Sequence, residues 1–178
     1  MKTLMNIIPL FFLFGCNYQM SKKDLGAQVT HNLTDNDAGK VEKIAKMFEG
    51  YSRDFPSAIN ISPKEALNLE KTVFIDVREP KEQRVSMLPG AITQKEFEDK
   101  KDEYLNSNLV IYCTIGYRSG IFTEKVSNQG FTAYNLKGGV LSWSHDQLGF
   151  YTGNNRTNKI HVYGSQWNLA HSKYETTY

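Results

Sequence analysis

The sequence predicts an α/β domain with a mainly parallel central sheet flanked by helices. Three short apolar runs, each followed by a helical pattern, carry this prediction: residues 72–75, 109–112 and 133–136. Continuous apolar runs of this length are typical of strands that are covered on both faces, as in parallel sheets. Strands that alternate with helices along the chain indicate parallel pairing, because each helix returns the chain to the same end of the sheet.

Helical patterns precede, separate and follow these runs. Residues 37–51 place apolar side chains on one face of a helix, with Asp37 as its cap. Ser62-Pro63-Lys64-Glu65 is typical of a helix start, with a serine cap, an early proline and a glutamate three residues later. We also expect helices at 94–105, at 121–128 and from the Gly138-Gly139 pair through Trp143, and a strand at 159–164.

The first residues differ from the rest of the chain. Lys2 is followed by an apolar run from Ile7 to Phe14, which is shorter than the about 20 residues that a membrane-spanning helix needs. The run has the length of a signal-peptide hydrophobic region. Leu13-Phe14-Gly15-Cys16 resembles the lipobox of bacterial lipoproteins, which implies cleavage before Cys16 and lipidation of that residue. The alternatives are an ordinary signal peptide cut elsewhere and an uncleaved anchor.

The chain therefore divides into five parts. A lipoprotein signal peptide is expected at 1–15, a lipidated tether at 16–36, an N-terminal helix at 37–56, one domain at 57–148 and an extension at 149–178. We expect the extension to pack on the domain surface; a partner-binding segment is the alternative. The lipid would hold the protein at a membrane of the bacterial cell envelope, facing the periplasm or the exterior. With a net charge of +2 and no basic stripe, no nucleic-acid partner is expected.

Cysteine usage singles out Cys113. The chain has two cysteines, and if Cys16 carries lipid, Cys113 has no partner for an intrachain disulfide. A free thiol outside the cytoplasm is prone to oxidation and cross-linking, so such a thiol is either buried and inert or kept for its reactivity. The position of Cys113 directly after residues 109–112 favours reactivity, because ligands of parallel sheets bind beyond the carboxyl ends of the strands.

The loop after this cysteine has the features of an anion-binding site; it consists of Thr114, Ile115, Gly116, Tyr117, Arg118 and Ser119. A tight turn from a strand into a helix points backbone N–H groups inward. The helix dipole adds about half a positive charge at the same place. Gly116 can adopt the left-handed conformation that such a turn requires, and Arg118 adds a full positive charge. The loop holds no acidic residue, so we expect it to favour the thiolate form of Cys113.

Four motifs resemble, in order and spacing, those of a single-domain rhodanese over roughly residues 57–148: VFIDVREPKE, LPGAI, IYCTIGYRSG and YNLKGGVLSW. The resemblance implies a rhodanese-like three-layer domain and a sulfurtransferase whose nucleophile, Cys113, carries a persulfide held by the amides of 114–119. It implies a small sulfur-containing anion such as thiosulfate as donor and a thiol or cyanide as acceptor, without a metal or organic cofactor. Asp76 and Arg78 end a neighbouring strand, and we expect them to form a structural ion pair that supports the loops.

Two other classes of function remain open. One is a non-catalytic module of the same fold that binds anions or a partner. The other is a cysteine phosphatase or arsenate reductase, but phosphatases that share this fold have a longer loop than the four residues between Cys113 and Arg118. The shorter loop fits a single sulfur atom better and favours sulfur transfer. Tyr117 is bulky for its position and is expected to gate access or to shape the choice of acceptor.

Overall fold

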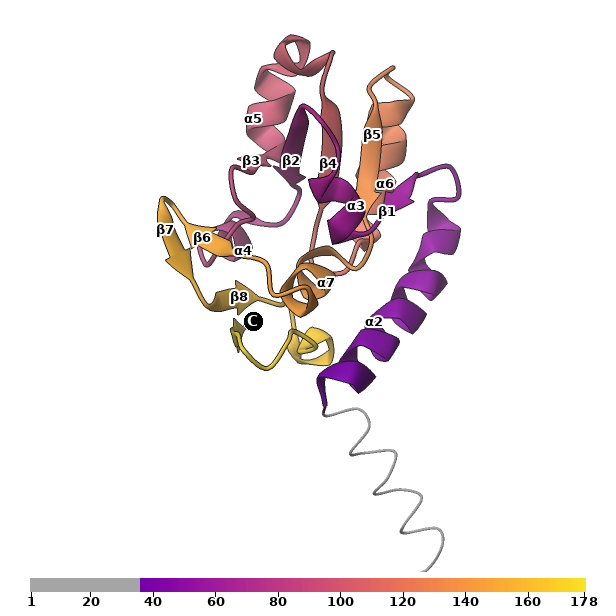
Figure 1. Ribbon diagram of the computed structural model, residues 1–178. Coiled ribbons are helices and arrows are strands. Elements are labelled where there is room, and N and C mark those ends of the chain that lie inside the picture. The colour runs from indigo at the N-terminus through magenta and orange to yellow at the C-terminus, as the bar shows by residue number, and fades with distance from the viewer. Residues whose placement is uncertain (1–35) are drawn as a thin grey trace, which may run out of the picture.

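A five-stranded parallel sheet in the order β1-β5-β4-β2-β3 forms the centre of the molecule (Figure 1). This computed structural model describes residues 36–178. The strands are β1 (Asn60–Ile61), β2 (Thr72–Asp76), β3 (Ile92–Thr93), β4 (Asn108–Tyr112) and β5 (Ala133–Leu136). The predicted α/β architecture is confirmed. The edge strands β1 and β3 escaped the prediction because strands of two residues each are too short to show a pattern.

Helices cover both faces of the sheet, which makes three layers (Figure 1). One face packs against α2 (Asp37–Tyr51), α3 (Pro63–Leu67) and α7 (Gly139–His145), and the other against α5 (Gln94–Asp99) and α6 (Tyr117–Ser127). Successive side chains of β4 alternate between the two cores, Val110 in the first and Leu109 in the second. Burial on both faces explains why the run 109–112 is continuously apolar.

Two helices begin at residues other than those predicted, and a local interaction explains each difference. The cap of α2 is Asn36, not Asp37, because the Asn36 side chain accepts the N–H of Gly39 at 2.8 Å. The start of α6 is Tyr117 rather than residue 121, because Gly116, at a φ of 102°, turns the chain directly into the helix. At α3 the predicted cap is confirmed, since the Ser62 hydroxyl accepts the N–H of Glu65 at 3.3 Å.

The amino end of α7 holds the turn that follows β4. The N–H groups of Val140 and Leu141 donate to the carbonyl oxygens of Cys113 and Thr114 at 3.0 and 3.3 Å. This approach requires Gly139, which has a φ of 51°, since an added Cβ there would collide with the Cys113 carbonyl oxygen. The Gly138-Gly139 pair thus brings two distant chain segments into backbone contact.

The C-terminal extension is part of the hydrophobic core. It contains the antiparallel pair β6 (Phe150–Thr152) and β7 (Asn155–Thr157), the parallel pair β8 (Lys159–His161) and β9 (Glu175–Thr177), and the 3₁₀ turn η3 (Ser165–Trp167). The other short elements precede it: the helix α4 (Pro80–Gln83) and the 3₁₀ turns η1 (Ser52–Asp54) and η2 (Lys101–Tyr104). Ile160 and Val162 are fully buried beside Trp143. The extension therefore belongs to the core and is more than a surface tail, and the expected strand at 159–164 ends at His161.

A polar clasp joins the start of α2 to the extension. The hydroxyl and the N–H of Ser172 donate to the two carboxylate oxygens of Asp37 at 2.6 and 2.9 Å. Lys40 donates to the carbonyl of Ala170 at 3.1 Å. Burial alone would raise the pKa of Asp37, but the hydrogen bonds from Ser172 lower it from 3.8 to about 2.

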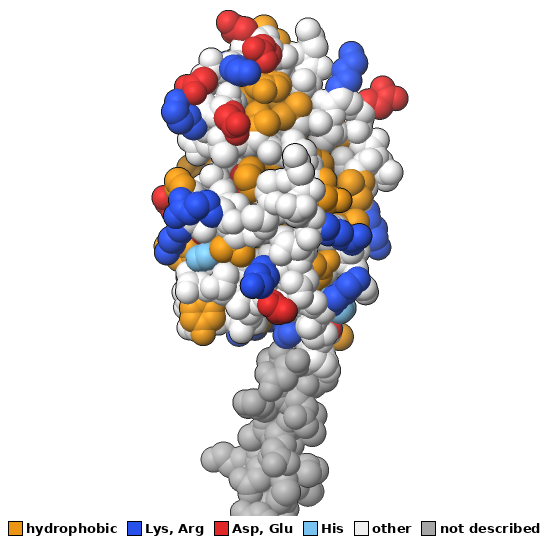
Figure 2. Space-filling view, turned by 90° about the vertical axis from the view of Figure 1, so that its left-hand side faces the viewer, with side chains coloured by type: hydrophobic (Ala, Val, Ile, Leu, Met, Phe, Trp, Pro, Cys, Tyr) orange, Lys and Arg blue, Asp and Glu red, His pale blue; other side chains and the backbone are white. Residues whose placement is uncertain are grey.

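The surface mixes charges of both signs. On the face shown in Figure 2, Lys and Arg side chains are interspersed with Asp and Glu, and hydrophobic side chains lie between them. No helix within residues 36–178 is both long and apolar enough to cross a bilayer. The expected signal peptide, Cys16 and nearly all of the tether lie outside the described residues.

We predict that Asp37→Asn lowers the free energy of unfolding at pH 7 by about 1 kcal/mol, because the amide binds Ser172 more weakly than the carboxylate does. The pKa of Asp37 is lower in the folded state, so its contribution is complete above pH 3.8 and is lost as the pH falls toward about 2. Urea unfolding of both proteins at a series of pH values measures this difference, which should narrow in acid. Glu42→Gln, at an exposed position of the same helix, is the control; a difference that does not depend on pH would contradict the prediction.

We also predict that Gly139→Ala lowers the free energy of unfolding by about 3 kcal/mol or more, through the left-handed backbone and the collision with the Cys113 carbonyl. Gly153→Ala is a matched control, since Gly153 has a φ of 56° but open space around it. There only the backbone cost remains, about 1 kcal/mol. Equal losses in the two variants would show that the contact between α7 and the loop contributes nothing.

Candidate active site

Cys113 lies directly after β4, with 1% of its surface exposed. Its sulfur accepts two hydrogen bonds from the loop that follows, from the N–H of Gly116 at 3.2 Å and from the hydroxyl of Ser119 at 3.5 Å. Both donors sit at the start of α6, where the helix dipole is positive. The sulfur is thus placed where negative charge on it would be stabilised.

Neighbouring elements fix the shape of this loop. The side chain of Asn135, on β5, donates to the carbonyl of Gly116 at 3.0 Å. The ring of Phe48, on α2, lies so close to Gly116 that a Cβ there would collide with it. Ile115 and Ser119 are buried, as is Thr114. The loop is therefore preorganised by contacts from α2, β5 and α7, in addition to its own turn.

The positive charge of Arg118 is neutralised within the site. Its guanidinium donates to both carboxylate oxygens of Glu82, on α4, at 2.7 and 2.8 Å, and the Glu82 side chain is fully buried. Burial opposes ionisation of Glu82, but the hydrogen bonds from Arg118 and from the Glu79 N–H lower its pKa. The expectation of an unopposed positive charge beside Cys113 is therefore corrected, because the opposing carboxylate comes from another part of the chain.

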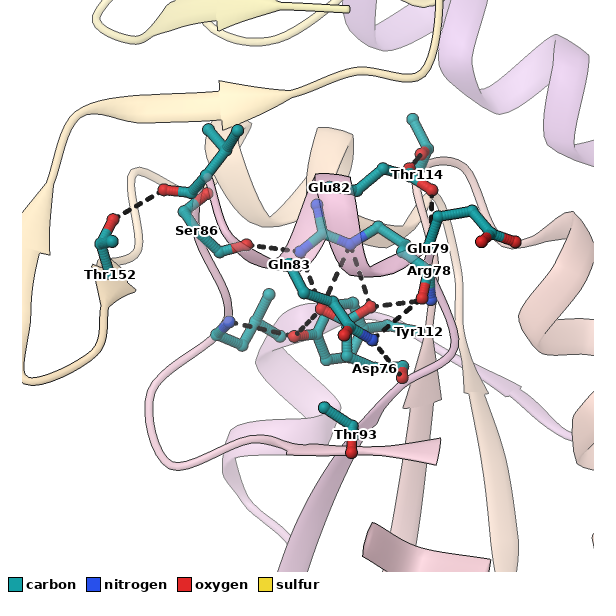
Figure 3. A network of polar contacts seen from close by, with 12 residues as sticks. Asp76, Arg78, Glu79, Glu82, Gln83, Ser86, Thr93, Tyr112, Thr114 and Thr152 are labelled. Carbon is teal, nitrogen blue, oxygen red and sulfur yellow. Dashed lines mark hydrogen bonds and ion pairs between the residues drawn. The ribbon is translucent and has the colours of Figure 1, made fainter. Parts of the chain in front are cut away.

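Thr114 completes this polar group. Its hydroxyl accepts from Arg118 and donates to Glu82, both at 3.3 Å. Figure 3 shows Glu82 and Thr114 side by side. Glu82 lies within the motif VFIDVREPKE, but its role could not be predicted, because spacing alone does not reveal that α4 lies against the start of α6.

Asp76 and Arg78 form a buried ion pair at the end of β2, with 2.7 Å between Oδ2 and Nη2 (Figure 3). Tyr112 donates its hydroxyl to the same carboxylate at 2.7 Å and accepts the N–H of Leu88 at 3.1 Å. Burial raises the pKa of Tyr112 well above its usual value, so the phenol stays protonated and acts as donor. In the described part of the chain no hydrogen bond joins Asp76 or Arg78 to Cys113. The ion pair instead holds Tyr112, the residue before Cys113, through the hydrogen bond to Asp76.

A cavity of about 340 Å³ opens at the sulfur. The loop contributes Cys113, Thr114, Ile115, Tyr117 and Arg118, α2 contributes Tyr51, and the extension contributes Tyr163 and Trp167. The structure thus brings the predicted loop residues together and adds three aromatic residues from outside the predicted domain. Nothing in the local sequence around these three signals that they approach Cys113. Among residues 36–178, no group of three or more His, Cys, Asp or Glu side chains is placed to hold a metal ion.

Comparisons with known proteins agree on the family. A family model described as "Rhodanese-like domain" matches residues 56–146. The chain is 33% identical over 82 residues to a Bacillus subtilis protein named "Putative sulfurtransferase YtwF". The matched region covers 42% of this chain and 75% of that protein. The chain is 32% identical over 90 residues to the tRNA uridine(34) hydroxylase of Buchnera aphidicola, but spans only 28% of that protein's length.

A solved structure shows the same fold. The thiosulfate sulfurtransferase of Pseudomonas aeruginosa superposes with a TM-score of 0.51 at 19% identity, over 64% of this chain and 23% of that one. The region matched by the family model runs from before β1 through α7 and includes the whole loop from β4 to α6. Because this region makes up half of the sequence, the chain belongs to the family of rhodanese-like domains.

Proposed function

We propose that the protein is a sulfurtransferase that moves a sulfane sulfur from a donor to a thiol or cyanide acceptor through a persulfide on Cys113. One observation carries the proposal: the sulfur of Cys113 accepts hydrogen bonds from Gly116 and Ser119 and lines an open cavity. Membership of the rhodanese-like family and similarity to a protein named as a sulfurtransferase support this chemistry.

The reaction would proceed in two halves. The Cys113 thiolate attacks the outer sulfur of a donor such as thiosulfate, the S–S bond of the donor breaks, and sulfite leaves with the bonding electron pair. A persulfide anion remains on Cys113, and the donors at the start of α6 stabilise its charge. Cyanide or a thiolate then attacks the terminal sulfur, which regenerates the Cys113 thiolate. This is covalent ping-pong catalysis, because the donor's product leaves before the acceptor reacts with the modified Cys113.

The ion pair of Arg118 supports sulfur transfer over phosphate chemistry. A phosphate dianion is bound best by a guanidinium whose two N–H groups are free to donate to it side by side. Here one N–H of Nη1 and one of Nη2 of Arg118 already donate to the two carboxylate oxygens of the buried Glu82. A single sulfur atom needs only the amide and hydroxyl donors that reach Cys113.

We predict that full-length protein in mild detergent gains one sulfur atom (about 32 Da) after brief incubation with thiosulfate and loses it on addition of cyanide. Cys113→Ser should show no gain, because a serine hydroxyl does not attack sulfane sulfur under these conditions. Intact-mass spectrometry measures both results. If the folded wild-type protein keeps a free thiol with thiosulfate, benzenethiosulfonate and polysulfide alike, sulfur transfer is contradicted. The non-catalytic module that binds anions or a partner then becomes the favoured alternative.

We further propose that Cys16 is lipidated and holds the protein at a membrane of the bacterial cell envelope; the lipobox resemblance of residues 13–16 supports this. Cells grown with labelled palmitate should incorporate it into the wild-type protein and into Cys113→Ala, but not into Cys16→Ala. The two variants are matched, since these are the two cysteines of the chain. Purified protein that retains Met1 and carries no lipid would overturn this proposal.

A further inference from the structure

We infer that the aromatic side chains around the Cys113 cavity form a binding site for a hydrophobic organic group, so that the protein takes organic sulfane-sulfur donors in preference to inorganic thiosulfate. This aromatic subsite consists of Tyr51, Tyr117, Tyr163 and Trp167. The inference rests on the proposed sulfur transfer and names the class of donor for it.

The four rings form two fixed pairs. Tyr51 and Tyr117 pack edge to face with their centroids 5.3 Å apart, and Tyr163 and Trp167 do so at 5.1 Å. Such pairs hold each other's orientation, so the apolar surface exists before a ligand binds. All four rings line the same cavity as the Cys113 sulfur. A ligand whose reactive sulfur reaches Cys113 would therefore place its remaining atoms against aromatic carbon.

The charge of the cavity makes thiosulfate, the inorganic alternative, a poorer donor than an organic monoanion. Among the described residues that line it, Arg118 is the only charged one, and Glu82 accepts one hydrogen bond from Nη1 and one from Nη2. The ring of Tyr163 covers the guanidinium of Arg118, with 5.0 Å between ring centroid and Cζ. A dianion such as thiosulfate would lose water here and meet a single cation whose charge Glu82 already balances. A monoanion with an apolar group loses less hydration and gains burial of its organic part.

Tyr163 is held in place at a cost in backbone energy. Its φ is 71°, in the left-handed region that residues other than glycine rarely adopt. The ring nitrogen Nδ1 of the buried His161 accepts the Tyr163 N–H at 3.1 Å and fixes this conformation. Core packing does not account for it, because 49% of the Tyr163 surface is exposed. A role at the cavity does account for it.

Most of the subsite is an addition to the family's domain. Tyr51, Tyr163 and Trp167 all lie outside residues 56–146, the region that the family model matches. These added segments would set the donor class, while the shared loop supplies the reactive thiol.

The chemistry with an organic thiosulfonate, R–SO₂–S⁻, parallels that with thiosulfate. The Cys113 thiolate attacks the outer sulfur, the S–S bond of the donor breaks, and the sulfinate R–SO₂⁻ leaves with the bonding electron pair. The persulfide anion on Cys113 is the other product, so two negative charges stand on each side of the reaction. The group R occupies the aromatic subsite.

Three donors test the inference on full-length protein in detergent: benzenethiosulfonate, methanethiosulfonate and thiosulfate. The first two share charge and reactive group and differ in R alone. The rate of persulfide formation, followed by quenched intact-mass spectrometry, is divided by the rate of the same donor with a small thiol in solution. We expect benzenethiosulfonate to exceed methanethiosulfonate by about 10-fold, and thiosulfate to be the slowest donor.

Variants of the subsite test its residues. In Tyr163→Ala and in Trp167→Ala the ratio between the benzene and methane donors should fall toward one. Tyr178→Ala, which removes an exposed ring of the same extension outside the cavity, should keep the wild-type ratio. Equal rates for the three donors in the wild type, or a ratio that survives both substitutions, would overturn the inference and leave sulfur transfer standing. Failure of every donor to form a persulfide would overturn both.

Discussion

The ion pair between Arg118 and Glu82 is the interaction on which the arrangement of the site depends. It connects α4, which follows β2, to α6, which follows β4, and it does so beside the sulfur of Cys113. A carboxylate as deeply buried as that of Glu82 is tolerated only with a close partner, and removing the partner would leave an uncompensated charge in the core. The same contact that holds the two loops together therefore also balances the charge of Arg118, the one charged side chain among the described residues that line the cavity.

Much of the fold follows from the sequence because strong local patterns mark it. The runs that became β2, β4 and β5 are buried on both faces or nearly so, and the start of α3 carries a complete capping box. The loop from Cys113 to Ser119 could be identified because it directly follows a buried strand and contains Gly116 and Arg118. Local patterns could not reveal β1 and β3, nor the early start of α6, which depends on the φ of Gly116.

The walls of the site could not be predicted for a different reason. Glu82, Tyr51, Tyr163 and Trp167 reach the cavity through the packing of elements that are far apart in sequence. Glu82 belongs to a short charged helix and Tyr51 to an amphipathic helix, so neither residue is unusual in its local sequence. Their common role exists only in three dimensions. One loop thus supplies the thiol of Cys113 and its hydrogen-bond donors, while residues from both ends of the described chain line the rest of the cavity.

The helix α2 also sets a distance. Its first residue is clasped to the extension, and its last residue, Tyr51, lines the cavity. Fifteen residues at the usual rise give a rod about 22 Å long. The point where the preceding segment joins the domain and the Tyr51 wall of the cavity are thus separated by the length of a rigid strut. If that segment is anchored as proposed, the Tyr51 wall of the cavity lies about one strut length from the end of the tether.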